Sequence, residues 1–182
     1  MSTIKLGCET YTWQMPGEQY KGKLEHIMDI CSKAGFAGIE PESSFLQHLE
    51  DPVLMKEVLD RFEMEYAVLA VVEDWLHPEE TAEERARADK WIEYLSHFPD
   101  TILLLVHMPQ SDRSNLRERQ ENCLSCVNAF ARRAAEKGIT VSKHPNSPEG
   151  SVFRIDSDYA MMIEGMDHEA IGYCPDIGHI AK

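Results

Sequence analysis

The stretch Tyr66-Ala-Val-Leu-Ala-Val-Val72 is a short apolar run of strand-forming residues, and it ends in the polar pair Glu73-Asp74. A second such run, Thr101 to Val106, begins about 30 to 40 residues later, the length of one strand-helix unit. The segment between them carries apolar residues at helical spacing, namely Trp91, Leu95 and Phe98. Together they predict one βαβ crossover with two parallel strands.

Four further runs repeat this pattern and complete a series of six. They are Ile4 to Cys8, Ala37 to Glu40, Ile139 to Ser142 and Ile171 to Cys174. Each of the first five is followed by a helical stretch, which favours a mostly parallel sheet with helices packed outside it.

The helices between the runs have readable ends. Thr81-x-x-Glu84 can form a capping box at a helix start. Gly35 and Gly138 follow two other helical stretches and are typical of helix ends, where glycine adopts a left-handed backbone conformation.

Six strand-helix units are compatible with an open doubly wound sheet or with most of a barrel. The turn after the first run reads Gly7-Cys-Glu-Thr-Tyr-Thr-Trp13 and lacks the G-x-G-x-x-G of a dinucleotide-binding sheet. A complete (β/α)8 TIM barrel usually needs about 250 residues, and this chain has 182. We therefore expect an α/β fold, a single TIM-barrel domain over residues 1–182 that is cut short after its sixth strand.

The composition excludes several function classes. Lys plus Arg minus Asp plus Glu is 18 − 32 = −14, and 43% of residues are hydrophobic, as in an ordinary globular protein. A nucleic-acid partner is disfavoured because that affinity depends on Lys and Arg at phosphates. The longest apolar run is far below the ~20 residues that span a bilayer, and the first residues carry no signal sequence. Five cysteines do not suggest a disulfide scaffold, so we expect a reducing cytoplasm and no membrane partner.

The pair Cys123-Leu-Ser-Cys126 has C-x-x-C spacing but lies in a helical stretch, without a second ligand pair. Cys123 falls on the apolar stripe of that helix. We expect buried thiols here rather than a redox or zinc site.

Chemistry-bearing side chains follow every one of the six runs. They are Glu9, Thr10, Glu40, Glu42, Glu73, Asp74, His107, His144, Asn146, Asp176 and His179. In a parallel α/β fold the carboxyl ends of the strands meet at one face, so these residues are expected around one cavity. Three histidines and several carboxylates would suit a divalent metal ion and a polyhydroxylated substrate. Any one of these residues could instead have a purely structural role at a strand end. Because the same pattern occurs at all six strand ends, this alternative is disfavoured for the set as a whole.

The last of these segments is the most specific. In Cys174-Pro-Asp-Ile-Gly-His179 a carboxylate and an imidazole lie three residues apart, and Gly178 allows a sharp turn between them. Together with the segment His144 to Arg154, it resembles the xylose-isomerase-like superfamily of sugar isomerases, epimerases and inosose dehydratases. The resemblance extends over nearly the whole chain, from Thr10-Tyr-Thr-Trp13 to Gly178-His-Ile-Ala-Lys182.

This resemblance implies a (β/α)8 barrel with a divalent ion, Mn, Mg, Co or Zn, at its mouth. Asp176 matches a metal ligand of the family, and His179 would contact substrate or assist proton transfer. Many relatives carry a metal-binding Glu on strand five, where this chain has Ser142 followed by Lys143. They also supply ligands from strands seven and eight, so we expect residues beyond Lys182 to complete the site.

The chemistry that follows is proton transfer next to a carbonyl of a sugar or polyol-derived substrate, with the metal as Lewis acid. We predict a sugar isomerase or epimerase with His144, His179 and Glu73 as candidate catalytic groups. Candidate substrate-binding groups are His107, Asn146 and Glu42. The alternatives are an inosose-type dehydratase, a non-catalytic sugar-binding relative, and an abasic-site endonuclease, which the net charge disfavours. Open sheet edges make a homo-oligomer a further expectation.

Overall fold

The computed structural model describes residues 4–180, and in this part of the chain every strand pair is parallel. The strands are β1 (Gly7–Glu9), β2 (Gly38–Glu40), β3 (Glu65–Tyr66), β4 (Val68–Glu73), β5 (Ile102–His107), β6 (Val141–Lys143) and β7 (Gly172–Tyr173). They pair in chain order as β1-β2-β3 and β4-β5-β6-β7. Consecutive parallel neighbours are the order of a (β/α) barrel, as the sequence predicted.

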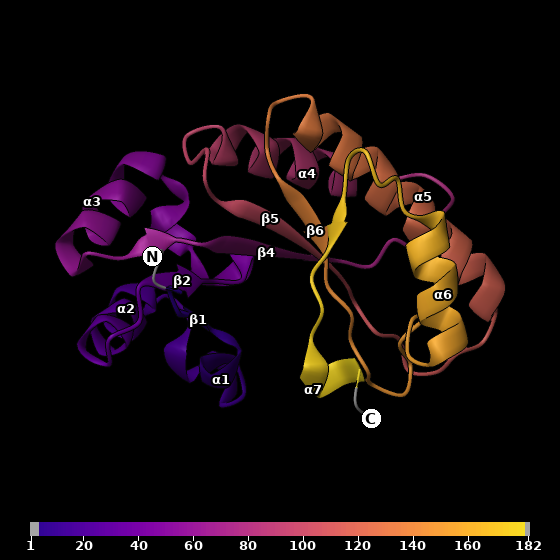
Figure 1. Cartoon of the computed structure of the whole chain (residues 1–182), viewed down its shortest axis with the longest axis horizontal. Coiled ribbons are helices and arrows are strands. Elements are labelled where there is room, and N and C mark those ends of the chain that lie inside the picture. The colour runs from indigo at the N-terminus through magenta and orange to yellow at the C-terminus, as the bar shows by residue number, and fades with distance from the viewer. Residues whose placement is uncertain (1–3, 181–182) are drawn as a thin grey trace.

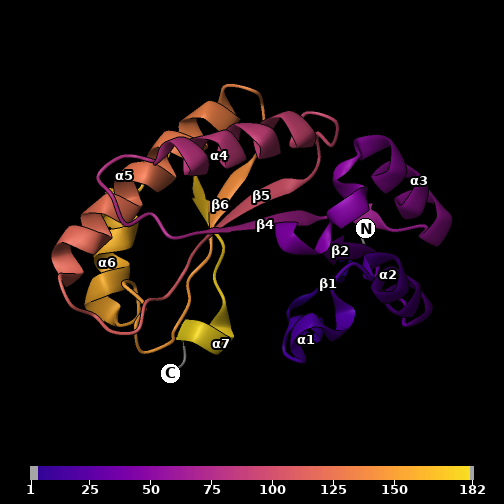
Figure 2. The same cartoon turned by 180° about the vertical axis from the view of Figure 1, so that it is seen from behind.

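The helices that lie on the outside of this curved sheet are α2 (Leu24–Lys33), α3 (Pro52–Phe62), α4 (Ala82–Leu95), α5 (Leu116–Ala135) and α6 (Asp156–Gly165) (Figure 1). Two short helices, α1 (Tyr11–Gln14) and α7 (Ile177–Ile180), follow the carboxyl ends of β1 and β7. Short 3-10 turns occupy Gly17–Tyr20, Ser43–Phe45 and Gln47–Glu50. Figures 1 and 2 both place α4, α5 and α6 along the outer side of β4 to β6.

The run from Tyr66 to Val72 forms two strands rather than the single strand that we expected. It divides at Ala67, whose N–H donates to Ile39 O at 3.1 Å, while its carbonyl accepts from Ile102 N at 3.1 Å. Beyond this point the segment that follows β2 keeps contact with β4 through an isolated parallel bridge between Glu42 and Ala70. The sheet therefore bends at Ala67 without losing continuity.

The first strand begins later than the sequence predicted. We expected a strand over Ile4 to Cys8, but β1 starts at Gly7, and Ile4 and Leu6 are 89% and 67% exposed. In the described chain β1 pairs only with β2, on one side. Because β1 has a neighbouring strand on one side only within residues 4–180, the apolar residues Ile4 and Leu6 lie outside the strand, which is shorter than the apolar run.

The helix ends agree with the sequence. The Thr81 side chain accepts from Glu84 N at 3.2 Å, and Glu84 returns the contact by accepting from Thr81 N at 2.8 Å. Gly35 and Gly138, after α2 and α5, have φ of +88° and +78°, a conformation that costs glycine little.

The apolar core lies between the sheet and these helices. In α5, Cys123, Val127 and Phe130 are at most 2% exposed and pack against the sheet. Full burial of an aromatic side chain such as Phe130 stabilises the fold by about 1.5–3 kcal/mol. Cys126 is also buried, so the prediction of buried thiols is confirmed. Within residues 4–180, none of the helices combines the length and apolar character that crossing a bilayer requires.

Candidate active site

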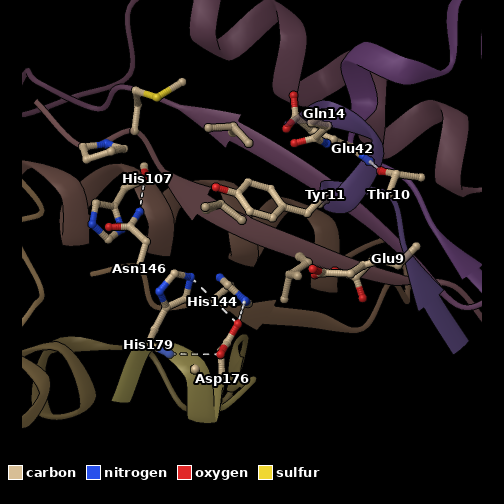
Figure 3. Close-up of a pocket in the computed structure, with 18 of the residues that line it drawn as sticks. Glu9, Thr10, Tyr11, Gln14, Glu42, His107, His144, Asn146, Asp176 and His179 are labelled. Atoms are coloured by element: carbon tan, nitrogen blue, oxygen red, sulfur yellow. Dashed lines mark hydrogen bonds and ion pairs between the residues drawn. The ribbon is translucent and has the colours of Figure 1, made fainter. Parts of the chain in front are cut away.

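A cavity of about 550 Å³ lies at the carboxyl ends of the strands, between α1 and α7 (Figure 3). Its floor is apolar and consists of Ala70 and Val72 from β4 and Leu104 and Val106 from β5. Its polar lining comprises Glu9, Thr10, Tyr11, Gln14, Glu40, Glu42, His107, His144, Asn146, Asp176 and His179. Of the seven residues to which the sequence analysis assigned a catalytic, substrate-binding or metal-binding role, six belong to this lining. The seventh, Glu73, does not.

His144, Asp176 and His179 form the tightest group in this cavity. Asp176 Oδ2 lies 3.3 Å from His144 Nε2 and 3.8 Å from His179 Nε2. One ligand atom from each residue falls within 4.8 Å of the others. The two imidazole rings meet edge to face, with centroids 5.6 Å apart. Figure 3 shows both rings turned toward the Asp176 carboxylate.

Local backbone geometry holds Asp176 and His179 in this position. Asp176 Oδ1 accepts from His179 N at 3.1 Å across the first turn of α7, and Ser147 Oγ lies 2.9 Å from His179 Nδ1. The Ser147 contact leaves His179 Nε2 as the ring nitrogen that faces Asp176. Because Nδ1 is engaged on the far side, the ring has one defined orientation.

The ionisation of this group favours a carboxylate beside neutral imidazole. Burial alone would raise the pKa of Asp176, but hydrogen bonds from the His179 and Gly178 backbone and the nearby imidazoles outweigh it and hold the pKa below 3.8. Burial lowers the pKa of His144 below 6.5, although Asp176 opposes the shift. An ionised carboxylate and an imidazole that is neutral at physiological pH are the forms in which both bind a metal ion.

Two carboxylates that we placed at strand ends, but to which we gave no role, also line the cavity. Glu9 and Glu40 are paired residues in the parallel register of β1 and β2. Burial and the neighbouring charges of Glu9 and Asp176 raise the pKa of Glu40 to about 7. Burial and Asp176 also raise the pKa of Glu9. The strand-end pattern alone did not distinguish these two from other acidic residues, because their register is a property of the folded sheet.

His107 reaches the cavity, but both of its ring nitrogens have protein partners. Lys143 Nζ lies 3.0 Å from Nδ1, and Ser151 Oγ lies 3.0 Å from Nε2. Because lysine can only donate here, Nδ1 accepts and Nε2 carries the proton. Complete burial and the charge of Lys143 lower the pKa of His107 well below its usual value, so the ring is neutral. Its predicted role in binding a substrate hydroxyl requires one of these bonds to open.

Lys143 is fully buried at the carboxyl end of β6. Besides His107, its ammonium group donates to Leu105 O and His144 O, each at 3.2 Å, and it lies 5.7 Å from the centre of the Trp75 ring. Burial lowers the pKa of Lys143 to about 8. These bonds tie the backbone beside His144 to β5.

Glu73 is turned away from the cavity. In β4 the side chains of Ala70 and Val72 form part of the cavity floor. Because successive side chains of a strand point to opposite faces of the sheet, Glu73 points to the other face. There its carboxylate accepts two hydrogen bonds from Arg87 of α4, at 2.6 and 2.7 Å. The structure does not bring Glu73 together with the other candidate catalytic residues.

A parallel barrel-type sheet, with helices outside and a cavity at the carboxyl ends of its strands, is the architecture of a (β/α) barrel protein. The chain belongs to the xylose isomerase-like TIM barrel family, whose sequence model matches residues 28–182. No curated protein matches the sequence.

Several solved structures share the fold. The IolI protein, described with a bound zinc atom, is 14% identical with a TM-score of 0.72, over 97% of this chain and 64% of its own. The probable 3-DHS dehydratase AsbF from Bacillus anthracis is 16% identical with a TM-score of 0.70, over 98% of this chain and 65% of its own. D-allulose 3-epimerase from Methylomonas sp. is 16% identical with a TM-score of 0.69, over 95% of this chain and 63% of its own. This chain thus spans less than two thirds of the length of each.

Proposed function

We propose that this cavity serves a sugar isomerase or epimerase, which transfers a proton next to a carbonyl group with the help of a divalent metal ion. The observation that carries the proposal is the group of His144, Asp176 and His179 at the carboxyl ends of the strands. The family and the fold agree with it, since its structural neighbours include an epimerase and a dehydratase.

The residues present fit a metal ion. The separations of 3.3 and 3.8 Å between ligand atoms suit a cation bound by two imidazole nitrogens and one carboxylate oxygen. Ser147 Oγ, 2.9 Å from His179 Nδ1, orients the His179 ring so that Nε2 faces the site. When bound, a divalent ion would polarise a substrate carbonyl and so acidify the adjacent carbon.

The chain's own residues supply the proton transfer. Where Asp176 and one of the two imidazoles hold the ion, the other imidazole can accept a proton from the substrate and return it. Glu40 is the other candidate, because a carboxyl group with a pKa of about 7 exchanges protons readily near neutral pH. Asn146 and Glu42 also line the cavity. The buried Asn146 Oδ1 has no protein partner among the described residues, and the Glu42 carboxylate, which accepts from Ser44 Oγ at 2.6 Å, has further acceptor capacity, so both can accept from substrate hydroxyl groups. Glu73 has no part in this scheme, because it faces Arg87.

Metal binding gives the first test. Calorimetric titration with Mn²⁺ and Zn²⁺ is expected to show one site per chain, with affinity reduced at least tenfold in Asp176→Ala. Asp60→Ala is the matched control, because Asp60 is exposed on α3 and does not line the cavity. Equal affinity in wild type and Asp176→Ala would contradict the assignment of this site.

Proton transfer gives the second test. Ketoses and inososes incubated with the protein in D₂O are expected to gain deuterium at the carbon beside the carbonyl, as followed by NMR. This readout covers isomerase and epimerase alike, and a dehydratase would in addition release water, which mass spectrometry detects. Exchange should disappear in Asp176→Ala and persist in Asp60→Ala. No exchange with any ketose or inosose would refute the proposed reaction.

A further inference from the structure

The ionisable side chains that line the cavity are mostly acidic. Four carboxylate residues line it, namely Glu9, Glu40, Glu42 and Asp176. Among the described residues that form this lining there is no lysine and no arginine. Above about pH 7, where Glu40 is ionised as well, negative charge would predominate even with a divalent cation held by the cluster of His144, Asp176 and His179.

Three cations close to the strand ends already have partners in the protein. Lys143 is fully buried and donates to His107 and to two backbone carbonyls. Arg87 pairs with Glu73 on the other face of the sheet. Arg154 donates to the Ser147 carbonyl at 3.1 Å. None of these three residues belongs to the cavity lining, so none offers its charge to a ligand there.

Carboxylates and hydroxyl groups are complementary. Each ionised carboxylate offers two acceptor oxygens, and sugar hydroxyls supply the donors. Glu9 and Glu40 are adjacent in register, so their oxygens can accept from neighbouring hydroxyls of one ligand. The apolar floor, formed by β4 and β5, suits the C–H face of a sugar ring or cyclic polyol.

A phosphate or carboxylate group on the ligand would meet the opposite situation. It brings a negative charge and acceptor oxygens to a surface that already presents the same, and like charges in a partly desolvated cavity repel strongly. The same repulsion applies to the phosphodiester backbone of DNA.

We infer that this cavity selects uncharged polyhydroxy compounds, sugars or cyclic polyols without a phosphate or carboxylate group, and excludes their phosphorylated forms. The inference rests on the proposed function, because it concerns the substrate class of the same site. It adds a choice between free sugars and sugar phosphates, which the metal-binding group by itself leaves open.

Matched ligand pairs test the inference. Binding of D-fructose is compared with D-fructose 6-phosphate, and of myo-inositol with myo-inositol 1-phosphate, by calorimetry in excess EDTA so that no cation attracts the phosphate. In each pair that binds, the neutral compound is expected to bind at least tenfold more tightly. In the double variant Glu9→Gln/Glu40→Gln, the ratio of the two dissociation constants in a pair should fall about tenfold, mainly because the phosphorylated compound binds more tightly. Glu57→Gln, which removes the same charge from the exposed face of α3, should leave it unchanged.

The outcomes separate the two proposals. Equal or tighter binding of the phosphorylated member in wild type would overturn the inference while leaving the proposed reaction standing. An unchanged preference in the double variant would also overturn it. The neutral preference without deuterium exchange would support the inference and refute the proposed reaction. Failure of all four compounds to bind would overturn the inference, whereas the proposed reaction would still be decided by the deuterium-exchange test with the metal present.

Discussion

Replacing Glu40 by glutamine is expected to stabilise the folded protein at neutral and alkaline pH. The pKa of this carboxyl group rises from 4.5 to about 7 on folding, because burial and the charges of Glu9 and Asp176 disfavour its ionised form. The unfolded chain escapes that penalty. Glutamine keeps the shape of the side chain and removes the charge.

The magnitude and the sign follow from linkage. Between pH 4.5 and about 7 the folded protein holds a proton at Glu40 that the unfolded chain has lost, so the free energy of unfolding falls as pH rises through this window. This rise of the Glu40 pKa from 4.5 to about 7 corresponds to roughly 3 kcal/mol. Because Glu40 is only partly buried, solvent screening reduces the expected effect to about 2 kcal/mol. Below the unfolded pKa both states are protonated, and this advantage of the variant should vanish.

Urea unfolding in EDTA at several pH values between 4 and 8 measures the effect. The difference in unfolding free energy between Glu40→Gln and wild type should be near zero at pH 4 and reach about 2 kcal/mol in favour of the variant above pH 7. Glu57→Gln is the control, because Glu57 is exposed on α3. A difference that does not change with pH, or a variant that is less stable at pH 8, would refute the reasoning.

Three further predictions concern other parts of the chain. Gly150→Ala should destabilise the fold by roughly 3 kcal/mol in urea unfolding, because a Cβ there would lie 1.5 Å from Gln110 O. Gly172→Ala is the control, because its Cβ would have only ordinary contacts, and equal effects of the two substitutions would contradict the prediction. Thr81→Ala should cost about 1 kcal/mol in thermal unfolding through loss of the α4 cap, and no loss would argue against the capping box in solution. The free energy of unfolding of the wild type should rise from about pH 8 to 10.5, because the folded protein loses the Lys143 proton at a lower pH than the unfolded chain does. Lys143→Met should abolish this rise, and the same rise in the variant would exclude Lys143 as its source.

Local sequence patterns determined the strand and helix order and the ends of several helices. The alternation of apolar runs with amphipathic stretches predicted parallel pairing, which every described strand pair confirms. The strand-end rule also placed Asp176, His144 and His179 at one face, and the structure brings them together. Such predictions succeed because helical period, capping and strand direction depend on residues close together in the chain.

The tertiary structure decided which strand-end residues face the cavity. Glu73 and Glu40 both end apolar runs, yet Glu73 turns to Arg87 and Glu40 enters the cavity beside Glu9. Facing and register are set by pairing with neighbouring strands, and a shift of one residue reverses the side on which a side chain lies. The burial of Lys143 against His107 and the bend at Ala67 likewise arise from contacts between segments far apart in the sequence. Local periodicity carries no information about such contacts, because they form only when the separate strand-helix units pack together.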